Sequence, residues 1–450
     1  MIQLKIAILF LFVVLVALTT NAAFADDPQN SYLNRWMVTA VAPGTIKPPL
    51  TLEWERSPIS FESGNASGYG EWPGRRIALT DHGFVTVIRK TLYLLDKENG
   101  RTLWMLPLKG FNITDWKVAE NVFFYTSVDS ANRELIYGTV DLTEHKERWI
   151  HKEPQPILYE SQELVISDNG LVIYVSDGDN KGANDAIVAI DIKTGDVKWR
   201  SSTDSNRALA SFSWFIFGKY LNAFVTPKNG GLHLKRFDLA DGKPTGTNHI
   251  FGSDSLGNGS HPNVTTADGI TFIGYNKILR PNMLWLLAYD MNASKLLWSK
   301  DISAEGLNPL MYFKHIIRYD NAKPMVATIH PSRFMLFDSE KGSILKDTRL
   351  PPAYAGWTDR NTSLYSYPYL LTGARRHKGN GMAFDLIALN LETGKVDWSY
   401  EIETRNSNFT NPTADILNFV VKDDRIFIGR SDARIMSFRF RGDASPASKQ

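Results

Sequence analysis

The stretch AIVAIDIKTGDVKWRSS, residues 186–202, contains two apolar runs separated by a polar turn. Asp191 can accept hydrogen bonds from the backbone N–H groups that follow it, as Asp and Asn do in turns. Gly195 supplies the positive φ that a short hairpin loop requires, and Trp199 places a large apolar side chain on the second run. The stretch therefore predicts a β-hairpin in which the carboxylate and the glycine are structural and not catalytic.

The same layout recurs along the chain. When the copies are aligned on their Asp or Asn, the steps between them are 45, 50, 47, 52, 48 and 52 residues. A fixed period near 50 residues is typical of a repeat architecture. Two copies have Gly246 and Lys346 where the others have Trp. The positions that carry the repeat are Trp54, Asp96, Trp104, Asp141, Trp149, Asp191, Gly195, Trp199, Asp238, Asp290, Trp298, Asp338, Asn390, Gly394 and Trp398.

Each repeat unit is β-structured. Short runs rich in Val and Ile, broken by Gly, Asn and Asp, predict about four strands in each unit. A sheet with two apolar faces needs neighbours, and closing such sheets into a ring removes the exposed ends. The 391 residues from Leu50 to Phe440 hold about eight periods. We therefore expect an all-β, eight-bladed β-propeller of four-stranded antiparallel blades, with seven blades as the alternative.

The last unit lacks a Trp strand, and Trp54 lies one period before Trp104. We expect the N-terminal strand to close the last blade. Residues 1–25 have the layout of a secretory signal peptide: Lys5, an apolar run, and the small residues Ala23 and Ala25. An uncleaved membrane anchor is disfavoured because the run is short. The expected division is 1–25 signal peptide, 26–49 N-terminal extension, 50–441 single β-propeller domain and 442–450 flexible C-terminal tail.

Composition limits the classes of function. The net charge is +2, and loss of Lys5 with the signal peptide lowers it to +1, so nothing favours nucleic acid or an anionic membrane as partner. The chain has no Cys, which excludes disulfides, thiolate metal sites and lipidation at Cys. No zinc-type histidine pair and no hydrolase or nucleotide-binding motif occurs. We expect no catalytic or metal-binding residue, and a monomer that is periplasmic or secreted and does not span the membrane once the signal peptide is cleaved.

AIDIKTGDVKW, from Ala189, resembles the A-x-D-x-x-T-G-x-x-x-W repeat of quinoprotein-like (PQQ-like) β-propellers, and ALNLETGKVDW, from Ala388, resembles it with Asn in place of Asp. The resemblance implies that the Trp docks adjacent blades. It also implies one of two functions. Some members are alcohol dehydrogenases that hold PQQ and usually Ca²⁺ near the ring axis, commonly with a Cys–Cys disulfide that this chain cannot form. Others are exported, bind partners without a cofactor and resemble the propeller subunit of the outer-membrane barrel assembly machinery.

We expect a non-enzymatic binding or assembly scaffold with a protein or peptide partner and no cofactor. A PQQ-dependent dehydrogenase of alcohols or sugars is the alternative, and a surface glycan binder is a third possibility. Aromatic and Arg residues on loops are common anchors of binding surfaces. The Asp–Gly turns should lie on one face of the ring, with the inter-blade connections and the other hairpins opposite. The candidate binding face there comprises Tyr69, Trp72, Arg75, Arg76, Trp116, Tyr354, Trp357, Asp359, Arg360, Arg375, Arg376 and His377.

Overall fold

The computed structural model describes residues 39–41, 46–57, 77–88, 90–110, 112–119, 121–129, 134–154, 164–167, 169–176, 186–202, 214–225, 232–251, 263–267, 269–276, 284–302, 314–320, 323–330, 333–349, 363–378, 381–405, 416–430 and 434–440. Within these ranges the regular structure is entirely β. No helix there is long and apolar enough to cross a membrane. The expected signal peptide and C-terminal tail lie outside these ranges.

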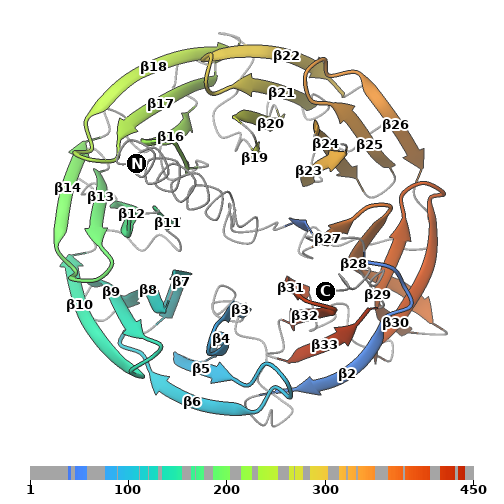
Figure 1. Ribbon diagram of the computed structural model, residues 1–450, viewed down its shortest axis with the longest axis horizontal. Coiled ribbons are helices and arrows are strands. Elements are labelled where there is room, and N and C mark those ends of the chain that lie inside the picture. Colours follow the sequence, from blue (N-terminus) through green and yellow to red (C-terminus); the bar gives the residue numbers. More distant parts are fainter. Residues whose placement is uncertain are drawn as a thin grey trace, which may run out of the picture.

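Eight sheets are arranged radially around a central axis (Figure 1). Each sheet is built from four strands in antiparallel order, and one sheet has a fifth strand. The prediction of an eight-bladed β-propeller is confirmed, and the seven-bladed alternative is wrong. We number the blades I to VIII from β3 onward and call the strands of each blade a to d, from the axis outward.

Blades I to IV hold sixteen consecutive strands. These are β3 (Ile77–Thr80), β4 (Gly83–Ile88), β5 (Thr91–Leu95) and β6 (Thr102–Pro107) in blade I; β7 (Asn112–Ala119), β8 (Val122–Asp129), β9 (Glu134–Asp141) and β10 (Lys146–Pro154) in blade II; β11 (Val165–Ile166), β12 (Leu171–Ser176), β13 (Ala186–Asp191) and β14 (Val197–Ser202) in blade III; β15 (Trp214–Phe217), β16 (Tyr220–Val225), β17 (Leu232–Asp238) and β18 (Pro244–Phe251) in blade IV.

Blades V to VIII complete the ring. They hold β19 (Asn263–Ala267), β20 (Ile270–Asn276), β21 (Leu284–Asp290) and β22 (Lys295–Asp301) in blade V; β23 (Lys314–Asp320), β24 (Lys323–His330), β25 (Arg333–Asp338) and β26 (Ile344–Arg349) in blade VI; β27 (Ser363–Ser366), β28 (Tyr369–Lys378), β29 (Gly381–Asn390) and β30 (Lys395–Arg405) in blade VII; β31 (Ile416–Lys422), β32 (Arg425–Arg430) and β33 (Ile435–Arg439) in blade VIII, whose fourth strand is β2 (Thr51–Arg56).

Strand β2 closes the ring as predicted. It pairs antiparallel with β33, with Trp54 opposite Ser437 and Glu55 opposite Met436. Ion pairs reinforce this pairing, because Glu55 contacts the buried Arg430 at 3.0 Å and Glu53 contacts Arg439 at 2.8 Å. Strands β2 and β33, which lie nearly 400 residues apart in the sequence, therefore share one sheet.

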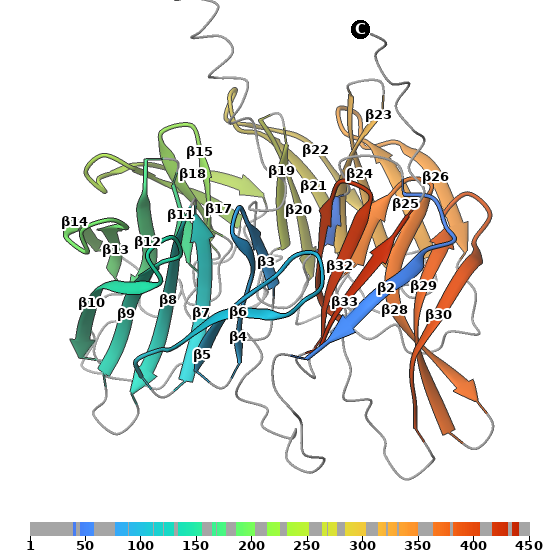
Figure 2. The ribbon, with the colours of Figure 1, turned by 60° about the horizontal axis from the view of Figure 1, so that its bottom comes forward.

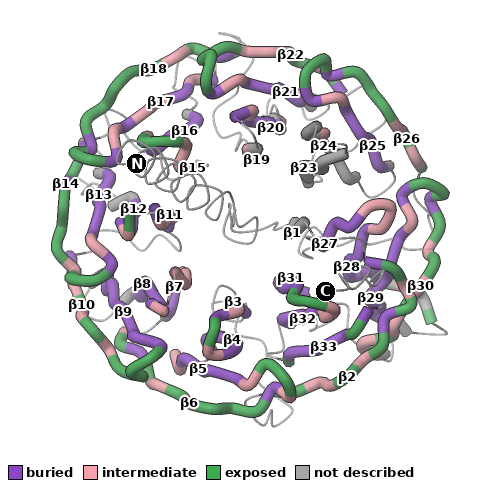
Figure 3. Tube along the Cα trace, viewed as in Figure 1, coloured by how far each residue is buried: buried purple, intermediate pink, exposed green. Residues whose placement is uncertain are grey.

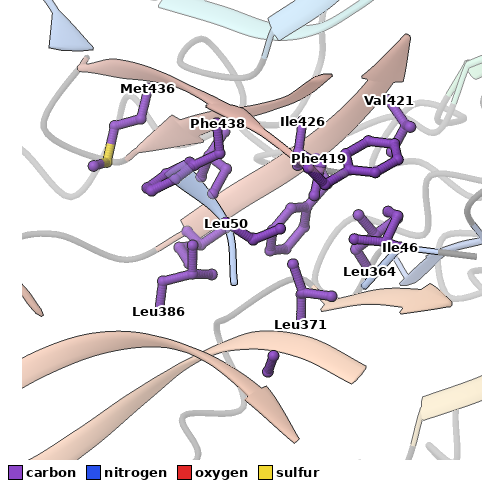
Figure 4. Close-up of a cluster of buried hydrophobic side chains, with 14 of the residues drawn as sticks. Ile46, Leu50, Leu364, Leu371, Leu386, Phe419, Val421, Ile426, Met436 and Phe438 are labelled. Carbon is purple, nitrogen blue, oxygen red and sulfur yellow. The ribbon is translucent and has the colours of Figure 1, made fainter. Parts of the chain in front are cut away.

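The propeller begins before the predicted boundary at Leu50. Strand β1 (Thr39–Val41) pairs parallel with β27 and forms the fifth, innermost strand of blade VII. Ile46 is then buried between blades VII and VIII, and its N–H donates to Ser366 Oγ at 2.6 Å. Leu50 packs in the same cluster, among residues such as Leu371 and Phe438 (Figure 4). Part of the expected N-terminal extension thus belongs to the fold and links the axis to the rim.

The Asp turn forms as predicted. One carboxylate oxygen of Asp191 accepts hydrogen bonds from the N–H groups of Lys193 and Thr194, at 2.8 and 3.1 Å. Asn390 does the same through its amide oxygen, which explains why Asn can replace Asp in this repeat. Gly195 has a φ of 80°, so the glycine supplies the conformation that the sequence predicts.

Three of the repeat Trp side chains dock one blade on a neighbouring blade through an indole hydrogen bond. Nε1 of Trp149 in blade II donates to the carbonyl oxygen of Ile192 in blade III at 3.0 Å. A Cβ at Gly195 would lie 2.7 Å from the same indole ring, so glycine also makes room for the docking. Trp199 and Trp298 repeat the arrangement with the turns of blades IV and VI.

The two copies without Trp dock through other side chains. In blade IV, Arg236 lies on β17, and its guanidinium donates to the carbonyl oxygen of Met291 at 3.1 Å. In blade VI, Thr348 Oγ1 donates to the carbonyl oxygen of Leu391 at 2.9 Å. The same backbone acceptor of the next blade is therefore satisfied by a different donor.

The hydrophobic core lies mainly between blades. Buried side chains of one blade pack on those of the next, as Phe124 in blade II and Tyr174 in blade III do. Figure 3 shows the result, with burial concentrated on the middle strands and exposure on the outermost strand of each blade. Function must therefore be sought on the two faces or the rim of the ring.

Candidate functional site

The ring has two faces that differ in construction. The turn face carries the loops that follow Asp96, Asp141, Asp191, Asp238, Asp290, Asp338 and Asn390. The connection face is the opposite one, where the outer strands end at Arg56, Pro107, Pro154, Ser202, Phe251, Asp301, Arg349 and Arg405.

The prediction about the hairpins needs a correction. The turns between strands a and b were expected opposite the Asp turns, but they lie beside them on the turn face. The N–H of Leu142 donates to the carbonyl oxygen of Asn121 at 2.8 Å, and Ile192 N–H donates to Gly170 at 2.9 Å. Successive antiparallel hairpins reverse the chain, so alternate connections share a face. Only the hairpins between strands b and c join the inter-blade connections on the connection face.

Most of the predicted binding face lies outside the described residues. This holds for the group in the segment between β2 and β3 and for the group between β26 and β27, which are Tyr69, Trp72, Arg75, Arg76, Tyr354, Trp357, Asp359 and Arg360. For these residues the structure supplies the topology alone, because each segment begins at the connection-face end of an outer strand.

Trp116 is a core residue and not part of a loop. It lies in β7 and is 4% exposed, packed with Phe123 at a ring-centroid distance of 5.4 Å. It belongs to the cluster between blades I and II, with Val85 and Leu142. The mostly polar residues that precede it, NITD, suggest a loop. In the strand, however, side chains point alternately to the two faces of the sheet, and the indole points toward the neighbouring blade.

Arg375, Arg376 and His377 lie in a strand, although the sequence suggests a loop. They belong to β28, which pairs with β29 as far as Lys378 opposite Gly381. Strands β28, β29 and β30 have 10, 10 and 11 residues and extend beyond the neighbouring blades (Figure 2). We call residues 373–378, 381–385 and 401–405 the blade VII extension.

The blade VII extension carries a network of charges. Arg376 Nε contacts the carboxylate of Asp385 at 2.7 Å, and this Asp side chain is only 1% exposed. The guanidinium also reaches Glu401 at 3.3 Å, and Lys378 contacts the same Glu at 2.7 Å. A buried carboxylate paired with Arg fixes the geometry of the strands, while the outer Glu and Lys remain accessible to solvent. The extension is thus a described part of the connection face that offers charges to a partner.

A second polar cluster lies between blades II and III. The buried Glu153 accepts hydrogen bonds from Arg200 and His151. Tyr137 and Tyr174 stack beside it with ring centroids 4.1 Å apart. Burial, reinforced by nearby negative charge, raises the pKa of both tyrosines, so their hydroxyls stay protonated in the physiological range. The cluster can donate and accept hydrogen bonds but supplies no general base from tyrosine.

The carboxylates of the described residues are engaged in the fold. Within the described ranges, no group of three or more His, Asp or Glu side chains lies close enough together to hold a metal ion. The buried carboxylates Asp385 and Glu153 already contact Arg side chains.

Known proteins with a similar sequence or fold include BamB. A family model described as outer membrane protein assembly factor BamB matches residues 51–218, from β2 to the turn after β15. No curated protein matches the chain in sequence. Among solved structures, BamB from Moraxella catarrhalis is 14% identical with a TM-score of 0.55, and the match covers 87% of this chain and all of that one.

Two further structures show how widely this fold is used. Sqt1 from Saccharomyces cerevisiae is 9% identical with a TM-score of 0.52, covering 89% of this chain and 100% of that chain. The dihydro-haem d1 dehydrogenase NirN is 12% identical with a TM-score of 0.50, covering 83% of this chain and 72% of that chain. At such identities each likeness concerns the fold alone. The family match over residues 51–218 and the eight-bladed ring together confirm the resemblance to the PQQ-like, BamB-like propellers that the turn motif predicts.

Proposed function

We propose that this protein is an exported, monomeric propeller that binds protein partners without catalysis and acts as an assembly scaffold in the periplasm or outside the cell. The observation that carries the proposal is the family match to outer membrane protein assembly factor BamB over residues 51–218. The BamB structure, which the match covers over its full length, has a fold similar to that of this chain.

The construction of the ring favours the connection face as the binding surface. On the turn face, strands c and d are joined by short loops whose backbone groups are hydrogen-bonded to the Asp side chain and to the neighbouring turn. On the connection face, much longer segments join the blades, such as residues 57–76 and 350–362. Binding residues are concentrated in loops that a rigid scaffold positions. The charges of the blade VII extension lie on the same side.

The test compares two sets of variants in co-isolation from the native cell envelope. Trp72→Ala with Trp357→Ala changes the connection face, and Lys193→Ala with Lys341→Ala is the matched change on the turn face. We expect the first pair to reduce recovery of specific partners at least about tenfold, as anchor aromatic residues do, and the second pair to leave it unchanged. Equal recovery with both pairs, or none above background with the unaltered protein, would contradict the proposal.

The enzymatic alternative, a PQQ-dependent dehydrogenase of alcohols or sugars, is separated by reconstitution. The purified protein is mixed with PQQ and Ca²⁺, and dye reduction is measured with a panel of both substrate classes. We expect no turnover above the protein-free control. Turnover that depends on both additives would replace the scaffold proposal with the enzymatic one.

A further inference from the structure

The outer strand of blade I differs from the other rim strands. Strand β6 (Thr102–Pro107) is the last strand of its sheet and lies on the rim of the ring (Figure 3). Leu103 and Met105 are 55% and 61% exposed, the two highest values among the large apolar side chains of the described residues. Their neighbours Trp104 and Leu106 point the other way and pack between blades I and II. The solvent-facing side of β6 is therefore apolar.

Each of the other seven blades has at least one polar residue at the same two places. The corresponding positions are those directly before and after the repeat Trp or the residue that replaces it. In blades II to VIII they are occupied by Arg148 and Ile150, Lys198 and Arg200, Thr245 and Thr247, Leu297 and Ser299, Leu345 and Asp347, Asp397 and Ser399, and Glu53 and Glu55. Blade I alone has two apolar residues there, and no side chain of β6 is charged.

An edge strand of this kind is open to a further strand. Edge strands present backbone N–H and C=O groups that a second chain can pair with, and proteins usually prevent this with charged side chains. The other uncharged rim strand, β18, keeps Thr245 and Thr247 at its solvent-facing positions. Strand β6 has no charged or polar side chain at these positions. It is also the last strand of its sheet, so an apolar surface lies beside backbone groups that a further strand could pair with.

The ends of β6 indicate what kind of segment fits. Arg101 precedes the strand and Lys109 follows it, and both are exposed. Among the described residues, neither side chain has an ion-pair partner, whereas the nearby Glu98 is held by Arg425. The apolar edge is therefore bracketed by two basic groups, which favour a partner with acidic residues at both ends.

The same charges disfavour a second copy of this chain. If two β6 strands paired antiparallel about a two-fold axis, Arg101 of one copy would lie within about two residues of Lys109 of the other at each end. Like charges placed across a strand pair are destabilising. The occupant is therefore a different protein.

We propose that β6 accepts an extended segment of a partner protein as a fifth strand of blade I, with apolar side chains at alternate positions of the segment and acidic residues at its ends. The apolar side chains would cover Leu103 and Met105, while the acidic residues would pair with Arg101 and Lys109. The inference rests on the proposed protein-binding function and gives it a specific surface, separate from the connection face.

The probe is a fluorescein-labelled peptide, Asp-Glu-Val-Thr-Val-Thr-Val-Glu-Asp, whose binding to the full-length mature protein is followed by fluorescence anisotropy. We expect saturable binding with a Kd below about 1 mM, weaker at high salt because exposed charges are screened. The variant Leu103→Glu with Met105→Lys should weaken binding at least about tenfold, because charge on an edge strand opposes pairing. The matched variant Thr245→Glu with Thr247→Lys on β18 should bind as the unaltered protein does.

Three outcomes would overturn the inference. They are no binding at about 1 mM peptide, equal weakening by the β6 and β18 variants, or a dimer in sedimentation velocity that the β6 variant abolishes. The peptide with Lys in place of its acidic residues should bind at least about tenfold more weakly, and equal affinity would also count against the proposal. Co-isolation from the cell envelope distinguishes the two hypotheses: specific partners recovered equally with the β6 variant would refute this surface and leave the scaffold function standing.

Discussion

Replacing Gly195 by Ala tests whether docking between blades depends on the glycine of the repeat turn. Gly195 has a φ of 80°, and a Cβ there would lie 2.7 Å from Trp149 of the preceding blade. Gly218 is the matched control, because its φ is 58° and nothing lies within 4 Å of its added Cβ. Both substitutions place Ala in the left-handed region, but only one of them displaces a neighbour.

The magnitudes follow from these two contributions. Ala in the left-handed region costs about 1–2 kcal/mol, which is the whole effect expected for Gly218→Ala. Gly195→Ala adds an overpacking cost of about 1–3 kcal/mol and loss of the indole hydrogen bond to Ile192, about 1 kcal/mol. We therefore expect Gly195→Ala to lower the free energy of unfolding by about 3–6 kcal/mol, roughly 2–4 kcal/mol more than the control.

The assay is equilibrium unfolding in urea, followed by far-ultraviolet circular dichroism. The substitution is also made in a Trp149→Ala background, where the ring that Cβ would strike is absent. There, Gly195→Ala should cost only the backbone contribution of about 1–2 kcal/mol. If Gly195→Ala and Gly218→Ala shift the midpoint equally, or if removal of the indole leaves the cost unchanged, the docking argument is refuted.

Three further predictions concern the core, the turns and the ring closure. Trp116→Ala should lower the free energy of unfolding by about 3–5 kcal/mol in urea titration, while partner binding by the folded variant stays unchanged. Burial opposes ionisation of Asp141, but hydrogen bonds from backbone N–H groups and from Arg148 outweigh it, so its pKa lies below 3.8. The stabilisation of the fold by the ionised Asp141 is therefore present above pH 3.8 and lost as the pH falls through the lower folded-state pKa. We expect the melting temperature of Asp141→Asn to fall less between neutral and acidic pH than that of the unaltered protein. Glu55→Gln weakens the pairing with buried Arg430, and we expect a cost of about 1–3 kcal/mol, measured as a lower urea midpoint.

Local chemistry made most of the architecture predictable. The turn at Asp191 and Gly195 needs only hydrogen bonds and a backbone conformation that neighbouring residues determine, and its repetition predicts a ring. Trp54 could be placed in the last blade because it lies one period before Trp104. Ring closure follows from this count, and the pairing of Trp54 with Ser437 agrees with it.

Contacts between distant segments were not predictable in the same way. Arg236 replaces a missing Trp from a different strand, so no alignment of repeat positions reveals it. Ile46 carries neither the turn motif nor the Trp, yet it packs between two blades. Trp116 was expected on a loop, and only the packing of blade I on blade II shows that it is buried. In each case tertiary packing, and not the local sequence, determines where the side chain lies.

The binding surfaces depend on departures from the repeat. The repeat positions hold the ring together, so a residue there reports on stability and says little about a partner. The letters TLWMLP at 102–107 could suggest a buried strand, because apolar residues dominate them. Only the position of β6 at the rim shows that Leu103 and Met105 face solvent, at places where each of the other seven blades has at least one polar residue. A surface that recognises a partner is therefore identified by combining the sheet order with the one unit that breaks the pattern of its neighbours.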